Sequence, residues 1–196
     1  MSQQKKLTII VVEKSRLRAN EVFDALNDGG WAYVTVIADE CVLARKVDEI
    51  NPDVVLIDLH NPGRDSLGSL SEAAGAKLRP VAMFVDQSDP ELIHAAINAG
   101  LSAYVVGGLE RHRIRPILEA AIARFRVTSQ MRSELEAAKS ALAARKTIDQ
   151  AKGLLIQAKG LTEDEAYQLI RKTAMDQGRR MIDVAQALIT ASKLLG

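Results

Sequence analysis

The sequence has little of several features that would define a class of function. It contains one cysteine, Cys41, so no disulfide can form within the chain. Its 26 basic and 25 acidic residues leave a formal net charge of +1. Binding to nucleic acid or a membrane would therefore have to depend on a local patch. The start of the chain lacks the apolar core of a signal peptide, and no apolar run is long enough to span a membrane. We therefore expect a cytoplasmic protein.

Motifs for catalysis are also missing. The three histidines, His60, His94 and His112, do not have metal-ligand spacing. No serine or cysteine lies in a nucleophile motif. Gly107-Gly108 indicates a turn and is not a glycine-rich phosphate loop. We therefore predict that the chain is not an enzyme and that it uses no cofactor and no metal.

Length and apolar content are sufficient for a large core. The chain has 196 residues, 47% of them hydrophobic, which suits one full domain and a small second one. Residues 7–125 alternate between short β-branched runs and segments of helical length, with proline or glycine at the joins. Several runs are almost wholly apolar, as in strands buried on both faces. They lie at residues 7–12, 33–37, 54–58, 81–85 and 103–106. The pattern predicts an α/β domain with a flavodoxin-like (βα)5 arrangement.

A long helix is predicted to follow. Residues 111–158 contain no proline after Pro116 and no glycine before Gly153, and good helix formers dominate. Four apolar residues within it have the seam spacing of a coiled coil: Met131, Leu135, Ala138 and Leu142. This stripe packs either on the chain's own later helices or on a second copy, and the sequence leaves both open. We expect a first domain at residues 1–125, a helical or coiled-coil linker at 126–145 and a second domain at 146–196.

Three short helices are predicted in the second domain. Gly160 is placed to end the first of them, and residues 162–165 form a capping box that begins the second. Gly178 closes the second helix, and a third runs from about residue 181 to residue 195. Helices this short are marginal alone, so we expect them to pack as a three-helix bundle.

Charges in this C-terminal segment are unevenly distributed. It contains eight cations and six acids. The acids gather at the start of the second predicted helix, whereas Arg171-Lys172 and Arg179-Arg180 lie toward its end and in the following turn. This end is suited to bind phosphate groups. A charge cluster alone, however, is more often a solvated surface.

Several other residues of the segment have two interpretations. Tyr167, its only aromatic residue, suits stacking on an unpaired base or a half-buried place in the bundle, and the second is favoured. Ala151 and Gly153 indicate close approach of a helix or of an RNA backbone. Their side chains cannot form hydrogen bonds, which favours the core. Lys152 is the better candidate for a phosphate contact, and Met175 is expected to fill a gap in the core.

Four blocks in this segment resemble the ANTAR family of antitermination regulators. They are Ala151-Lys152-Gly153-Leu154-Leu155, Glu163-Asp164-Glu165-Ala166-Tyr167, Ala174-Met175 and Ile182-Asp183-Val184-Ala185. The resemblance implies a domain that binds an RNA hairpin. It therefore favours phosphate binding over a solvated surface as the role of the cations. On this basis the predicted RNA contacts are Lys152, Lys159, Tyr167, Arg171, Lys172, Arg179 and Arg180.

The first domain resembles a response-regulator receiver, with Asp58 at the phosphoacceptor position. A working receiver needs an acidic pair, a hydroxyl and a lysine at positions that read here Glu13-Lys14, Val85 and Gly107. Valine and glycine supply neither a side-chain hydrogen bond nor a charge. We therefore predict a pseudo-receiver, in which Lys14 is a candidate to lie near Asp58 and replace the charge of the metal.

Further stretches resemble the NasT type of nitrate-assimilation regulator within the ANTAR family. They are Asn61-Pro62-Gly63-Arg64-Asp65, Met83-Phe84 with Asp89-Pro90, and Ala99-Gly100 with Ser102-Ala103-Tyr104. This resemblance implies binding to a leader mRNA hairpin of nitrate or nitrite assimilation operons, which prevents a terminator from forming. It also implies control by a nitrate-sensing partner protein of the NasS type. The alternatives are a response regulator driven by phosphorylation of Asp58, with a DNA- or protein-binding output, and a protein-interaction adaptor.

Overall fold

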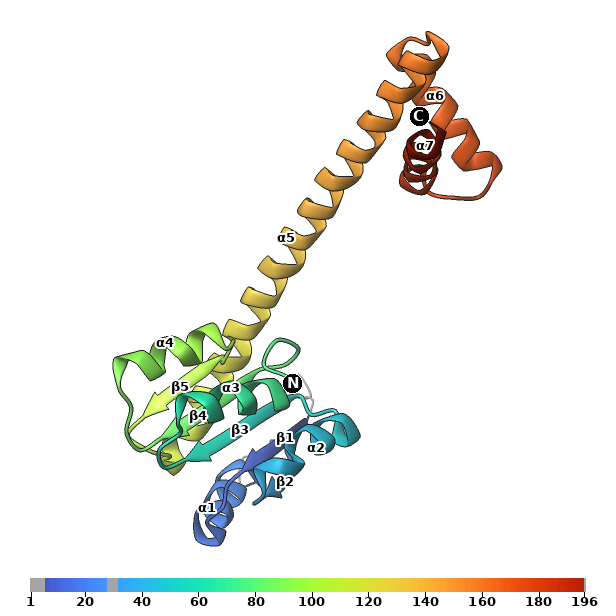
Figure 1. Ribbon diagram of the computed structural model, residues 1–196. Coiled ribbons are helices and arrows are strands. Elements are labelled where there is room, and N and C mark those ends of the chain that lie inside the picture. Colours follow the sequence, from blue (N-terminus) through green and yellow to red (C-terminus); the bar gives the residue numbers. More distant parts are fainter. Residues whose placement is uncertain (1–5, 28–31, 196) are drawn as a thin grey trace. The chain divides into compact units, whose positions relative to one another are not determined.

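The chain folds into two compact units. The computed structural model describes residues 6–27 and 32–195, and the units cover residues 1–130 and 131–196. Helix α5 (Arg111–Lys159) contributes its first part to one unit and its last part to the other (Figure 1). None of the described helices is both long enough and apolar enough to cross a membrane.

The first unit is built on a parallel sheet of five strands in the order β2-β1-β3-β4-β5. The strands are β1 (Leu7–Val12), β2 (Ala32–Ile37), β3 (Val54–Leu59), β4 (Val81–Val85) and β5 (Ala103–Val106). Every residue of β4 is buried, and so is every residue of β3 except the last. This burial explains their apolar sequences, because helices cover both faces of the sheet. The predicted flavodoxin-like fold is confirmed.

Each face of the sheet has its own core. The helices α2 (Leu43–Ile50), α3 (Arg64–Ala73) and α4 (Pro90–Asn98) pack on one face, and α1 (Arg16–Asn27) and the start of α5 pack on the other (Figure 1). A short 3-10 helix, η1 (Glu40–Val42), precedes α2. Alternate residues of a strand enter opposite cores, as the pleat requires.

The carboxyl ends of the strands meet at one edge of the sheet. Val12 is in register with Ile57, which brings Glu13 beside Asp58. Asp58 is in register with Phe84 on the next strand. Ligands of open α/β sheets bind at this edge, and the register brings segments far apart in the chain together there beside Asp58. We call the surroundings of Asp58 the acceptor pocket, because Asp58 is at the position that resembles the phosphoacceptor of receivers.

The second unit is a three-helix bundle. The end of α5 packs with α6 (Glu163–Asp176) and α7 (Met181–Leu195) around a core of eight buried residues: Ala151, Leu155, Ala166, Ile170, Ala174, Val184, Ala185 and Ile189. The predicted capping box begins α6, with Thr162 and Glu165 satisfying each other's backbone amides. Gly160 (φ 66°) and Gly178 (φ 61°) follow helix ends in the left-handed conformation, as predicted.

The apolar stripe in the middle of α5 is exposed. Met131 is 63% exposed, Leu135 53% and Leu142 71%, and Ala138 is also exposed. The interpretation in which this stripe packs on the chain's own later helices is therefore wrong, since Leu155 and Ala151 fill that role instead.

Candidate functional sites

The acceptor pocket of the first unit is held together by an arginine. Arg18, in the first turn of α1, places its Nε 3.2 Å from Oδ2 of Asp58 and its Nη2 3.4 Å from Oδ1. The same Nε lies 3.9 Å from Oε2 of Glu13. Asp58 is 2% exposed and Glu13 5%. A guanidinium thus lies against two carboxyls that are removed from water.

The outer side of Arg18 contacts a second pair of residues. Its Nη2 donates to Oδ1 of Asp86 at 3.3 Å, and its Nη1 lies 3.0 Å from Nδ1 of His60. His60 also contacts Asp86 directly. His60, and then Arg18, lower the pKa of Asp86. The pocket is therefore a network of three acids, an arginine and a histidine.

Asp58 has a perturbed acidity. Burial, followed by the neighbouring carboxyl of Glu13, raises the pKa of Asp58 to about 8, although the charge of Arg18 acts in the opposite direction. A buried carboxyl with an acidic neighbour favours its protonated form. Near neutral pH Asp58 therefore retains a proton, which lowers its nucleophilicity toward a phosphoryl donor.

Lys14 does not lie beside Asp58. Its Nζ pairs with Oε1 of Glu40 at 2.9 Å, and its side chain is 66% exposed. Glu40 raises the pKa of Lys14. The expectation that Lys14 supplies the charge near Asp58 is corrected here, because Arg18 supplies it. The prediction from the sequence did not include Arg18, because it rested only on the known pocket positions of receivers. An arginine in the first helical turn after Glu13 could have indicated this contact.

The loop after β5 leaves room for this arrangement. Gly107 (φ 99°) and Gly108 (φ 77°) adopt a conformation that favours glycine. A Cβ added at Gly108 would lie 3.0 Å from Oδ1 of Asp86 and 3.7 Å from Nη2 of Arg18. Val85 is fully buried in the core and offers no hydroxyl.

The pocket does not fit the magnesium ion of a working receiver. The second acid of the pair is Lys14, which faces Glu40, and the guanidinium of Arg18 lies on Asp58 and near Glu13. A divalent ion prefers carboxylate oxygens that are free of other cations. Among the described residues, no group of three or more acids, histidines and cysteines is arranged to hold a metal.

Two of the cations predicted to bind RNA are held by acids of the second unit. Nζ of Lys152 lies 2.7 Å from Asp149 and 2.8 Å from Glu163, and its side chain is 14% exposed. Arg180 donates two hydrogen bonds to Asp183, at 3.0 and 2.9 Å. Lys152 thus ties α5 to the start of α6, and this pairing favours a structural role for it.

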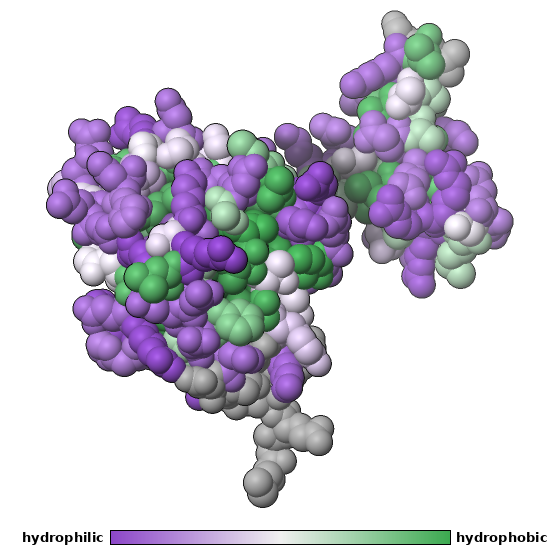
Figure 2. All heavy atoms as spheres, turned by 90° about the horizontal axis from the view of Figure 1, so that it is seen from below, coloured by the Kyte–Doolittle hydropathy of each residue, from purple (hydrophilic) through white to green (hydrophobic). Residues whose placement is uncertain are grey.

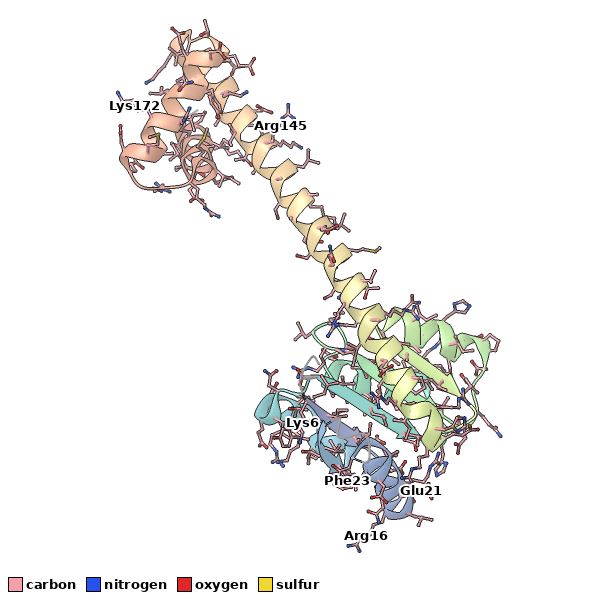
Figure 3. All side chains as sticks on the ribbon, turned by 180° about the vertical axis from the view of Figure 1, so that it is seen from behind. Lys6, Arg16, Glu21, Phe23, Arg145 and Lys172 are labelled. Carbon is pink, nitrogen blue, oxygen red and sulfur yellow. The ribbon has the colours of Figure 1, made fainter. Side chains whose placement is uncertain are left out.

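An exposed face of α6 carries the freer cations. Tyr167 is 39% exposed, Met175 is 71% exposed, and Arg171 and Lys172 are exposed between them. Within residues 6–27 and 32–195, no carboxylate forms an ion pair with either cation. Lys172 points away from the bundle (Figure 3). We call Tyr167, Arg171, Lys172 and Met175 the α6 face.

Met175 corrects a prediction, because it lies on this face and not in the core. The positions are one helical turn apart, since Tyr167, Arg171 and Met175 are spaced by four. Arg179 and Arg180, both exposed, follow in the turn between α6 and α7. Lys159 lies at the end of α5, next to the start of α6, so the bundle does not bring it to the end of α6 where the arginines lie.

The two small residues of the first ANTAR-like block differ. Ala151 is fully buried in the bundle core. A Cβ added at Gly153 would meet no heavy atom within 4 Å. The core explanation therefore applies to Ala151 and fails for Gly153.

Comparison with known proteins first gives the class of each unit. The fold of the first unit is similar to receiver domains. The receiver domain of the response regulator NarL from Mycobacterium tuberculosis superposes with a TM-score of 0.51 at 20% identity, covering 59% of this chain and 96% of that one. Residues 136–189 match the ANTAR domain family. The chain thus combines a fold similar to receiver domains with a segment that matches the ANTAR domain family.

Two relatives then narrow the comparison. The transcriptional regulatory protein PdtaR of Mycobacterium tuberculosis is 28% identical over 181 residues, which cover 92% of this chain and 88% of that protein. The nitrate regulatory protein of Klebsiella oxytoca is 42% identical over 65 residues, 33% of this chain and 16% of that protein. Both relatives carry the name of regulatory proteins, and the one that aligns over most of this chain is named as a transcriptional regulator.

Proposed function

We propose that the chain is a transcription antitermination regulator whose second unit binds a hairpin in leader mRNA and prevents a terminator from forming. The α6 face is the observation that carries this proposal. It places an exposed aromatic ring, two cations that pair with no carboxylate of the described residues, and an exposed methionine within the segment that matches the ANTAR domain. Cations bind phosphates, and an aromatic ring stacks on an unpaired loop base.

The experiment that tests RNA binding measures the affinity of the full chain for a leader hairpin over a range of salt concentrations. Arg171→Ala with Lys172→Ala removes two cations of the α6 face. Loss of two phosphate contacts should weaken binding and flatten the slope of log affinity against log salt by about 1.5–2. An unchanged slope would show that these two residues do not contact phosphates. If the wild-type chain binds no hairpin, the proposed function is refuted.

A matched control lies in the first unit. Arg45 and Lys46 are also adjacent, in α2, and are 68% and 35% exposed. Arg45→Ala with Lys46→Ala removes the same charge outside the ANTAR match. Its salt slope should equal that of the wild type. An equal loss in both double variants would show a nonspecific effect of net charge.

The regulated transcripts are proposed to be leaders of nitrate or nitrite assimilation operons. The NasT-like stretches and the similarity to the nitrate regulatory protein of Klebsiella oxytoca support this assignment. A gel shift with such a leader, against the same RNA with a rearranged loop, tests it. Equal binding to both RNAs would remove the nitrate assignment and leave general RNA binding.

Control is proposed to come from a nitrate-sensing partner of the NasS type that sequesters the chain. Arg18 keeps the acceptor pocket closed to phosphoryl chemistry, so an occupied surface is the more suitable switch. Figure 2 shows apolar side chains gathered on the visible surface of the first unit among hydrophilic ones. A shift from 1:99 to 99:1 needs about 5.5 kcal/mol of differential binding, which an ordinary interface provides. Equal RNA affinity with and without the partner would refute sequestration.

The exposed stripe on α5 is proposed to pair two copies of the chain. Met131, Leu135, Ala138 and Leu142 have coiled-coil spacing, and no residue in the described part of the chain covers them. Each copy would then present one RNA-binding bundle. Sedimentation of the full chain at micromolar concentration tests the proposal, and a monomer would refute it.

A second candidate function is a regulator driven by phosphorylation of Asp58. The carboxyl of Asp58 lies at the sheet edge where receivers are modified, which favours this alternative. Incubation with acetyl phosphate and Mg²⁺, followed by intact mass measurement, separates the two. We expect no stable adduct, and an adduct that changes the oligomeric state would establish the alternative.

A further inference from the structure

Gly153 lies in a helix where the chain itself gives no reason for a glycine. It is six residues before the end of α5, and its φ is not in the left-handed region. Glycine is the least favourable residue in a helix interior apart from proline. Apart from the adjoining backbone of its own helix, a Cβ at this position would meet no heavy atom of the described residues within 4 Å. Neither backbone conformation nor packing within the chain therefore requires the glycine.

The open side of Gly153 faces a groove. The groove has a volume of about 450 Å³ and is bordered by Gln150, Gly153 and Gln157 of α5 and by Ile189, Ser192 and Lys193 of α7. The volume is in the range of ligand-binding sites. Its lining contains a lysine and no carboxylate. A groove with this lining favours a ligand that is flat, partly apolar and attached to negative charge.

We infer that this groove receives an unpaired base of the RNA loop, with the backbone of the RNA passing close to Gly153. The inference rests on the proposed function and adds a contact surface that α6 does not line. Buried Ile189, together with the partly buried Leu154, provides an apolar floor for the face of a base. The amides of Gln150 and Gln157 both donate and accept hydrogen bonds, as reading a base edge requires. Lys193 is exposed and pairs with a phosphate.

A second copy of the chain fits the groove less well. The seam that contains Leu135 and Leu142 continues in steps of seven to Asp149 and Ile156. That line does not pass through Gly153. Asp149 does not border the groove. The groove therefore lies beside the pairing stripe, and a single chain completes it.

Substitution of Gly153 tests the inference, because it should raise the stability of the fold and lower the affinity for RNA. Gly153→Ala should raise the melting temperature, because alanine is the better helix former and meets free space. The same change should weaken RNA binding severalfold, and Gly153→Leu should weaken it by roughly tenfold or more, as expected for loss of one base contact. The salt slope should not change, since glycine carries no charge that would neutralise a phosphate. Lys193→Gln should instead flatten the slope by about one.

Gly68 provides the matched control. It lies within α3 of the first unit, and an added Cβ there also meets nothing within 4 Å. Gly68→Ala should stabilise the chain and leave RNA binding unchanged. If both alanine variants raise the melting temperature and only Gly153→Ala weakens RNA binding, the effect on binding is separate from the effect on folding.

The probe is a set of hairpins with a constant stem and a randomised loop, enriched on the full wild-type chain, with the fully paired stem as a control RNA. If the wild type retains no hairpin, the proposed function fails. If it retains hairpins and both Gly153 variants bind them as tightly, the groove assignment alone fails. A change of sedimentation mass in Gly153→Leu, at unchanged RNA affinity, would assign the groove to a second copy and overturn the inference.

Discussion

Removal of Arg18 should destabilise the first unit, and the loss should grow with pH. Arg18→Met keeps an unbranched apolar stem and deletes the guanidinium that lies 3.2 Å from Asp58 and 3.9 Å from Glu13. Removing one partner from a buried pair of charges typically costs about 3–5 kcal/mol. Asp58 can reduce this cost by keeping a proton, since its pKa is already raised to about 8.

The pH dependence follows from the protons bound in each state. The folded state keeps a proton on Asp58 over the range from its ordinary pKa up to about 8, where the unfolded state has lost it. Stability from this group therefore falls as pH rises through that range. Arg18 lowers the pKa of Asp58, so its removal widens the range. We expect a loss of about 1 kcal/mol at pH 6 and about 3 kcal/mol at pH 9.

Urea unfolding of the full chain measures this difference. Hydrogen exchange of the backbone amides in β3 and β4, followed by mass spectrometry over the urea range, reports on the first unit alone. Lys14→Met is the control, because the Lys14–Glu40 pair is on the surface and should be worth less than about 1 kcal/mol. An equal loss at both pH values, or a larger loss in Lys14→Met, would refute the role given to Arg18.

Four further outcomes are expected. Asp58→Asn removes the titrating carboxyl, so its melting temperature should fall less than that of the wild type between pH 6 and pH 9, and parallel curves would contradict the raised pKa. Arg179→Ala with Arg180→Ala should flatten the salt slope of RNA binding by about one to two. The lower value is expected because Asp183 already holds Arg180, and an unchanged slope would exclude both. Leu135→Lys with Leu142→Lys should convert a dimer to a monomer in sedimentation, and a persistent dimer would place the interface elsewhere. Thr162→Ala removes the cap of α6 and should cost about 1 kcal/mol in a thermal melt, whereas an unchanged melting temperature would show that the cap contributes little.

The fold could be predicted from the sequence because its signals are local. The boundaries predicted for β1, β4, β5 and α7 agree with the structure, since apolar runs and flanking prolines or glycines mark them. The capping box at Thr162 was equally readable. β2 begins one residue earlier than predicted and β3 ends one residue later, because pairing at the end of a strand depends on the neighbouring strand as well as on the residue itself.

The sites were less predictable because they depend on which long side chain reaches a buried acid. Sequence position favoured Lys14, but Lys14 precedes α1 and faces Glu40, whereas Arg18 is turned inward by the helix. The ion pair of Lys152 could not be predicted for the same reason, since its partner Glu163 is eleven residues away in the sequence. Met175 was placed in the core on its apolar character alone, and the spacing of Ala166, Ile170 and Ala174 on α6 would have shown that it lies on another face.

The two glycines after β5 limit how this pocket can change over generations. A side chain at Gly107 or at Gly108 would have to adopt a backbone conformation that L side chains rarely take, and one at Gly108 would also crowd the carboxylate of Asp86. Under the proposed pseudo-receiver, a change to a working phosphoacceptor would need replacement of Arg18, rebuilding of this turn and a second acid at the position of Lys14. Replacing Arg18 would leave two buried carboxyls without their guanidinium, and a side chain at Gly107 would strain the turn, so changes at these two places destabilise the first unit before the others can act.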